Sequence, residues 1–164
     1  MVVTSDALLA ALRDVKDPEL PMLDVVELGI VRDVQTAGDH VRVDITPTYS
    51  GCPAIKAIED DIVATLTARG IPHVTVRTVY SPAWTTDWLS PETKEKLRNA
   101  GIAPPGRVEP EPLVMLQRAV HAMTVCPFCG SSDTEERSEF GSTACKAIHY
   151  CKSCCQPFDR FKAL

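Results

Sequence analysis

The stretch Thr46–Pro53, T-P-T-Y-S-G-C-P, is the segment around which the first two-thirds of the chain is organised. It joins an alternating strand pattern to the start of a long amphipathic helix and places Cys52 directly before Pro53. Backbone N–H groups and the positive end of a helix dipole favour a thiolate over a thiol there. Gly51 has no side chain, so a partner atom could approach the backbone closely. The stretch predicts a reactive thiol loop, and the alternative is a buried cysteine that packs as a small apolar residue.

The segments that precede this loop predict a helix and a β-hairpin. Apolar residues at helical spacing predict a helix from about Asp6 to Asp14, with Thr4 or Ser5 as its cap. Ile30–Thr36 and His40–Pro47 are strand patterns separated by a Gly-Asp turn, and we expect them to pair antiparallel.

The segments that follow the loop complete a small α+β domain. Pro53–Arg69 predicts a long helix, and His73–Tyr80 predicts a third strand that returns to the hairpin. Ser90 is the expected cap of a further helix at Pro91–Asn99. The apolar face expected for the long helix comprises Ile55, Ile58, Ile62, Val63 and Leu66.

A proline-rich segment divides the chain into two parts. Residues 1–101 form the α+β domain, which we expect to be a small mixed sheet with packed helices. Residues 102–112 contain four prolines and few apolar residues, which is typical of a linker. Residues 113–164 form a small β module, in which 113–123 and 143–150 are the strands expected to lead into its two cysteine turns.

The small module has two C-x2-C pairs, C-P-F-C and C-K-S-C, separated by 21 residues. Two such pairs on tight turns can present four thiolates at the corners of a tetrahedron. A segment of this size has little core and needs a metal to fold. We expect one structural zinc ion per chain in a zinc ribbon, with iron as the alternative. The expected ligands are Cys126, Cys129, Cys151 and Cys154.

Three further residues lie near these pairs. Cys155 could replace Cys154 as a ligand, although the spacing favours Cys154. Cys145 is either a small packed residue or a second reactive thiol. His149 is expected on a strand surface rather than at the metal.

Two further groups of residues are candidates for function. Thr48 belongs to the hydroxyl-rich flank of Cys52, and Asp17 lies in a D-P-E turn where it is either a neighbour of the thiol or a turn cap. Trp84 and Trp88, the only tryptophans of the chain, stand four residues apart. They are either core residues or anchors that dock a partner.

Composition excludes several classes of function. The net charge of −5 argues against a nucleic-acid binder, which needs an excess of lysine and arginine. No apolar run approaches the ~20 residues of a membrane span, and the N-terminus does not resemble a signal peptide. We therefore expect a cytoplasmic protein, whose cysteines stay reduced. Without a Walker loop, a Rossmann fingerprint or an HExxH motif, the chain has no complete catalytic set, and we expect no enzyme by itself.

Longer motifs resemble two known families. V-K-D-P-E-L (15–20), E-L-G-I-V-R-D-V (27–34) and residues 46–62 resemble the metal–sulfur cluster assembly domain family, which includes the SufT-like proteins. The whole chain is similar to the PaaD family of phenylacetyl-CoA epoxidase components. That similarity lies in S-P-A-W-T-T-D-W, G-I-A-P-P, C-P-F-C-G-S, F-G-S-T-A-C-K-A and P-F-D-R-F-K.

The resemblance implies a role in making or inserting metal centres, with Cys52 and Asp17 as the functional pair. It implies an accessory subunit of an oxygenase system that converts phenylacetyl-CoA to its ring-1,2-epoxide. The oxygenase and reductase subunits are then the partners. Either the di-iron centre or the [2Fe–2S] cluster would be the client, with transient iron or iron–sulfur binding to the chain. A docking role without metal transfer is the alternative, and a homodimer is left open. Relatives often have a cysteine where Ala163 stands, which weakens any requirement for a C-terminal thiol.

Overall fold

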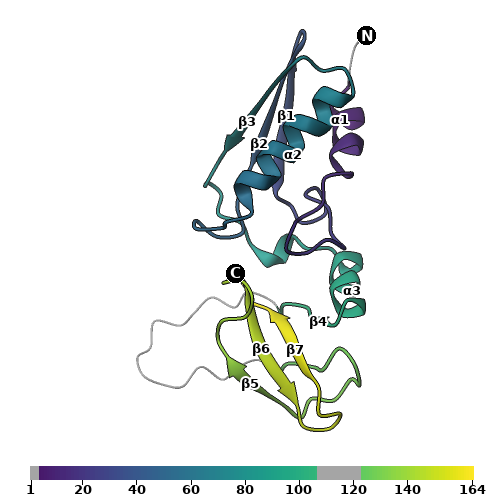
Figure 1. Cartoon of the computed structure of the whole chain (residues 1–164), viewed down its shortest axis with the longest axis vertical. Coiled ribbons are helices and arrows are strands. Elements are labelled where there is room, and N and C mark those ends of the chain that lie inside the picture. Colours follow the sequence, from purple (N-terminus) through teal and green to yellow (C-terminus); the bar gives the residue numbers. More distant parts are fainter. Residues whose placement is uncertain (1–3, 107–122) are drawn as a thin grey trace. The chain divides into compact units, whose positions relative to one another are not determined.

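The computed structural model describes residues 4–106 and 123–164 (Figure 1). These residues form two compact units. The first comprises the described residues up to Trp84 together with Trp88–Thr93, and the second comprises Thr85–Asp87 together with the described residues from Lys94 onward. The first unit contains a three-stranded sheet and the second a four-stranded sheet. The expected α+β class with a small second β module is confirmed.

The sheet of the first unit has the order β1-β2-β3. Strands β1 (Val31–Ala37) and β2 (His40–Ile45) form the predicted antiparallel hairpin, and Gly38 takes a φ of +65° at its turn. Strand β3 (His73–Thr78) returns parallel to β2, with His40 opposite His73 and Ile45 opposite Thr78. Two strands that are distant in sequence therefore start side by side and end side by side.

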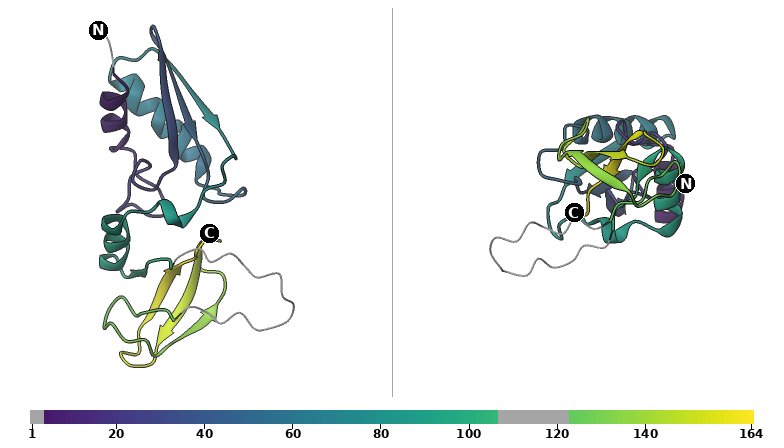
Figure 2. Two further views of the ribbon diagram at one scale, coloured as in Figure 1. Left: turned by 180° about the vertical axis from the view of Figure 1, so that it is seen from behind. Right: turned by 90° about the horizontal axis from the view of Figure 1, so that it is seen from below.

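Two helices cover one face of this sheet (Figure 2). Helix α1 (Ser5–Leu12) begins at Thr4, whose hydroxyl accepts a hydrogen bond from the Ala7 N–H. Helix α2 (Ile55–Ala68) contacts α1 and β3. Its predicted apolar face is wrong at Val63, which is 38% exposed. The buried residues of the helix follow an i, i+4 row, and Val63 lies beside that row. The buried side chains of the two helices are Leu8, Ala11 and Leu12 with Ile58, Ile62 and Leu66.

The boundary between the two units differs from the predicted domain boundary. Helix α3 (Pro91–Asn99) follows a short 3-10 turn, η1 (Thr86–Trp88), and has the predicted Ser90 cap on the Thr93 N–H. Most of α3 belongs to the second unit, and Ile102–Ala103, expected to begin the linker, forms a buried strand there. Its apolar side chains are buried in that sheet, which excludes an exposed linker at these positions. The other expected linker residues beyond 106 lie outside the described residues.

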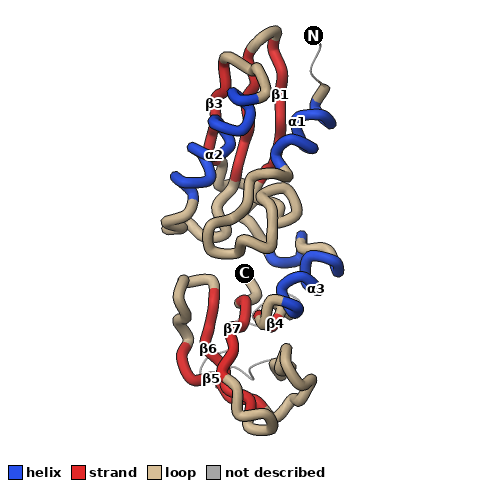
Figure 3. Tube along the Cα trace, turned by 45° about the vertical axis from the view of Figure 1, so that its right-hand side comes forward, coloured by secondary structure: helices blue, strands red, loops and turns tan. Residues whose placement is uncertain are grey.

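The sheet of the second unit has the order β4-β7-β6-β5 (Figure 3). Strands β5 (Thr134–Ser138), β6 (Lys146–Cys151) and β7 (Pro157–Phe161) are antiparallel neighbours. Strand β4 (Ile102–Ala103) pairs parallel with β7 and closes the other edge. Of the two strands expected before the cysteine turns, the second is confirmed as β6. The first falls almost entirely outside the described residues.

Within the described ranges, no helix combines the length and the apolar composition that crossing a bilayer requires.

Candidate functional site

The four predicted ligand cysteines converge in the second unit. Their sulfur atoms all lie within 4.8 Å of one another. The Sγ atoms of Cys126 and Cys154 are 3.7 Å apart, and those of Cys129 and Cys151 are 3.5 Å apart. A tetrahedral ion with metal–sulfur bonds of ~2.3 Å needs thiolates ~3.8 Å apart, so these separations fit a metal. We call these four residues the four-thiol cluster.

Backbone turns hold the four-thiol cluster in place. The Cys126 carbonyl accepts a hydrogen bond from the Gly130 N–H at 3.0 Å, and Gly130 has a φ of +75°. The Cys151 N–H donates to the Gln156 carbonyl at 3.0 Å. Cys126 and Cys151 are also buried in a small apolar core with Phe158. Three of the four cysteines are therefore in the core of this unit or packed against it, since Cys154 also packs there, while Cys129 is exposed.

Local contacts shift the pKa values of two thiols of the cluster in opposite directions. The backbone N–H of Cys154 lowers the pKa of Cys151 to about 7. Burial and the neighbouring thiols raise the pKa of Cys154 to about 12. A metal ion that binds all four sulfurs must displace at least the Cys154 proton at neutral pH. The spacing of the four sulfur atoms fits a bound metal ion, which would displace that proton.

The neighbouring residues separate clearly from this cluster. Cys155 is exposed with a φ of 58°, and its sulfur does not lie with the four that are grouped within 4.8 Å, whereas that of Cys154 does. Cys145 is buried beside the Thr143 hydroxyl at 3.0 Å, which matches a packed residue rather than an accessible thiol. The prediction for His149 is wrong. Its ring is 3% exposed and stacks on Phe158, because its position in β6 faces the core.

The loop of residues 46–54, the thiol loop, connects β2 to α2. Thr46 is buried, and its N–H donates to the Ile30 carbonyl at 2.8 Å, which fixes the start of the loop against the hairpin. The Cys52 N–H then donates to the Tyr49 carbonyl at 3.1 Å. Because these turns continue to residue 54, α2 begins at Ile55 and not at Pro53 as predicted. Cys52 therefore lies before the helix, half-buried.

The predicted preference of Cys52 for a thiolate is wrong. Burial raises the pKa of the Cys52 thiol, and the carboxylates of Glu19 and Asp17 raise it further. Hydrogen bonds from the Ala54 backbone and the Thr48 side chain act in the opposite direction but do not compensate. Removal from water and two nearby negative charges therefore outweigh these hydrogen bonds, and the pKa of Cys52 lies above its usual value.

The structure brings Asp17, Glu19 and Thr48 into the electrostatic environment of Cys52. One Asp17 carboxylate oxygen also accepts hydrogen bonds from the Glu19 and Leu20 N–H groups, at 2.8 and 2.9 Å. Asp17 therefore caps its turn and neighbours the thiol, so both of its predicted roles are present together. The two carboxylates place negative charge near the sulfur, which favours a cation there.

The two tryptophans pack over Gly29, whose φ of +71° ends the turn before β1. Trp84 is 5% exposed, and its indole N–H donates to the Leu28 carbonyl at 2.9 Å. Trp88 is half-buried beneath the Arg32 guanidinium, 3.8 Å from the ring centroid. Burial of Trp84 fits the core-packing alternative and leaves its ring no surface for docking.

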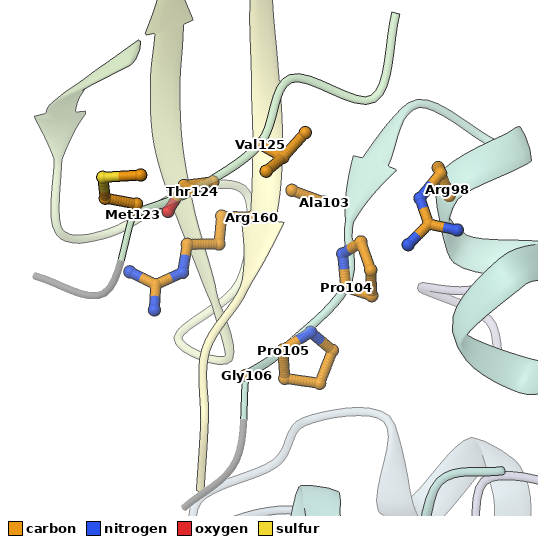
Figure 4. A pocket seen from close by; sticks show the side chains of 9 residues that line it. All are labelled: Arg98, Ala103, Pro104, Pro105, Gly106, Met123, Thr124, Val125 and Arg160. Atoms are coloured by element: carbon orange, nitrogen blue, oxygen red, sulfur yellow. The ribbon is translucent and has the colours of Figure 1, made fainter. Parts of the chain in front are cut away.

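A cavity of about 180 Å³ lies in the second unit beside β4 (Figure 4). Arg98 and Arg160 flank its apolar wall, which includes Pro104 and Val125. Residues adjoining Gly106 and Met123 on its rim lie outside the described ranges, so we assign the cavity no ligand.

One group of potential metal ligands was missed from the sequence. Asp39, His40 and His73 present ligand atoms within 4.8 Å of one another. Two features could have indicated them: both predicted strands begin with histidine, and parallel pairing places strand starts together.

Two family models match the chain in the same division. Residues 5–80 match an iron–sulfur cluster assembly protein family, and residues 110–162 match a PaaD zinc beta ribbon domain. Solved structures agree for the first part. A domain of unknown function, DUF59, from Bacillus anthracis has 32% identity and a TM-score of 0.53, over 56% of this chain and 89% of that one. Fold and sites thus define an iron–sulfur assembly-type domain followed by a four-cysteine ribbon.

Full-length relatives specify the family. The candidate D component of the 1,2-phenylacetyl-CoA epoxidase of Escherichia coli is 42% identical over 159 residues, 94% of this chain and 90% of that protein. The Fe-S protein maturation auxiliary factor SufT of Staphylococcus aureus is 40% identical over 78 residues, 45% of this chain and 85% of that factor. The chain belongs to the PaaD family of phenylacetyl-CoA epoxidase components.

Proposed function

We propose that this chain is a maturation factor that hands iron or an iron–sulfur cluster to a phenylacetyl-CoA epoxidase, with Cys52 as the transient ligand. The observation that supports it most is the arrangement at the thiol loop, where a half-buried thiol has the carboxylates of Asp17 and Glu19 and the Thr48 hydroxyl as neighbours. The similarity of this domain to proteins named as Fe-S maturation factors supports the same role.

The raised pKa of Cys52 suits a ligand that must let go of its cargo. Binding forms a sulfur–iron bond and releases the thiol proton to water. Return of a proton to the sulfur breaks that bond and frees the iron to the client, with no change in oxidation state. A proton competes with iron for this thiolate, and a single thiol would hold an ion less tightly than four cysteines that bind it together. Asp17 and Glu19 attract the cation and offset part of this loss.

The experiment that tests this role is co-expression with the epoxidase subunits. Cys52→Ser should leave the oxygenase or the reductase short of iron, whereas the matched control Cys155→Ser alters an exposed cysteine outside the four-thiol cluster and should not. Iron analysis of each purified subunit and the absorption of the [2Fe–2S] cluster identify the client. Fully metallated, active epoxidase with Cys52→Ser would end the proposal.

For the four-thiol cluster we propose one structural zinc ion per chain. Sulfur separations of 3.5 and 3.7 Å and the place of two ligands in a small core support a closed, permanent site. None of the seven cysteines, all of which the structure describes, is in a disulfide, and we propose the reducing cytoplasm as the compartment. Metal analysis of anaerobically purified protein should give one zinc, unchanged by Cys52→Ser. Iron in its place would contradict the assignment.

A second candidate role is docking, in which the chain holds the epoxidase together without metal transfer. Four apolar side chains of the second unit are more than half exposed, and such surface favours a protein partner. This role predicts stoichiometric co-purification with the epoxidase and full tolerance of Cys52→Ser. Sedimentation of the chain alone would test for a homodimer. The exposed residues are Met123, Val125, Phe128 and Phe140.

A further inference from the structure

Three metal-ligating side chains meet at the end of the first sheet that is opposite the thiol loop. His40 is the first residue of β2 and His73 the first residue of β3, and the parallel register places them side by side. Asp39 occupies the hairpin turn directly before His40. The thiol loop follows the other end of β2, so ~17 Å of strand separates the two places.

The geometry of these side chains is convergent. The two imidazole rings stack with centroids 4.5 Å apart and an interplanar angle of 17°. The two carboxylate oxygens of Asp39 each face one ring, at 3.7 Å from the His40 Nε2 and 3.5 Å from the His73 Nε2. All three residues are exposed, so an ion can reach them from solvent. Both Nε2 atoms therefore point at one carboxylate, leaving a common position for a cation.

We propose that Asp39, His40 and His73, the histidine site, bind one divalent transition-metal ion. Imidazole nitrogen suits zinc, iron(II), nickel and copper, whereas magnesium and calcium prefer oxygen ligands. Two histidines and one carboxylate leave coordination positions open to water. Such an exposed site binds reversibly and is distinct in ligand chemistry from the four-thiol cluster. The site is independent of the proposed role of Cys52.

The alternative is an ordinary ion pair, in which protonated imidazoles contact the Asp39 carboxylate without metal. The two arrangements differ in a measurable way. A metal site binds one further ion per chain with saturation and needs both histidines, whereas an ion pair binds none.

The test uses untagged protein that carries Cys52→Ser and whose four-thiol cluster is already loaded with metal. The Cys52 thiol then cannot contribute to binding. Cobalt(II) is titrated and followed by its visible absorption, and zinc binding is measured by calorimetry. We expect one additional equivalent of each ion, without the thiolate-to-cobalt charge-transfer band of a cysteine site. Magnesium should not compete.

Matched variants locate the binding. Loss of a supporting partner already weakens metal sites about 10- to 100-fold, so loss of two direct ligands in His40→Ala/His73→Ala should weaken binding at least that much. Asp39→Asn should weaken it less. Thr75→Ala changes another exposed residue on the same face of β3 and should bind as the parent does. Absence of the extra equivalent in the parent, or equal binding by the double-alanine variant, would overturn the proposal.

Discussion

Replacement of Trp84 by phenylalanine should destabilise the first unit by about 2–3 kcal/mol. The change removes the indole N–H that donates to the Leu28 carbonyl at 2.9 Å. Depriving a buried carbonyl of this donor costs about 1–3 kcal/mol, and the smaller ring leaves a void that adds to it. For a unit of this size, that loss corresponds to a fall in melting temperature of roughly 10–20 °C.

Urea unfolding followed by tryptophan fluorescence measures this loss directly. Both tryptophans belong to the first unit, so Trp88 remains as the reporter in Trp84→Phe. The control Trp88→Phe keeps Trp84 as reporter and loses mainly the contact of its half-buried ring with Arg32, about 0.5–1 kcal/mol. If Trp84→Phe were no less stable than this control and yet lost binding to the epoxidase subunits, the core assignment would be refuted and Trp84 would be a docking residue.

Three further changes test other parts of the structure. Glu19→Gln removes a negative charge that raises the pKa of Cys52, so the pKa of Cys52 should fall. Its alkylation rate at pH 8 should therefore rise, and an unchanged rate would contradict the assigned environment. Cys129→Ser should abolish stoichiometric metal binding by the four-thiol cluster and lower the melting temperature of the second unit, as measured by metal analysis and calorimetry. Gly101→Ala puts a Cβ at a φ of +79° and 3.0 Å from the Phe128 ring, so it should cost about 1–2 kcal/mol; a stability within about 0.5 kcal/mol of wild type would refute this.

Local patterns predicted most of the secondary structure because each depends on neighbours in sequence. The hairpin, the long helix and the Ser90 cap were all indicated by spacing or by a single polar side chain. Errors occurred where distant residues decide the outcome. Ile102 appeared to begin a linker because the strand that buries it, β7, lies more than fifty residues away. His149 appeared exposed because the ring that stacks on it, Phe158, comes from the neighbouring strand and not from its own.

The spacing of the cysteine pairs was enough to predict the four-thiol cluster, because each tight C-x2-C turn places two sulfur atoms close together. The sequence by itself thus determined the α+β class, the four cysteines of the cluster and the position of Cys52 between strand and helix. Only the tertiary structure decided the direction in which the pKa of that thiol is shifted. Its pKa depends on burial and on the charges of Glu19 and Asp17, which are more than thirty residues away along the chain but act through space. The same reason explains the histidine site, which exists only because parallel pairing brings the starts of β2 and β3 together.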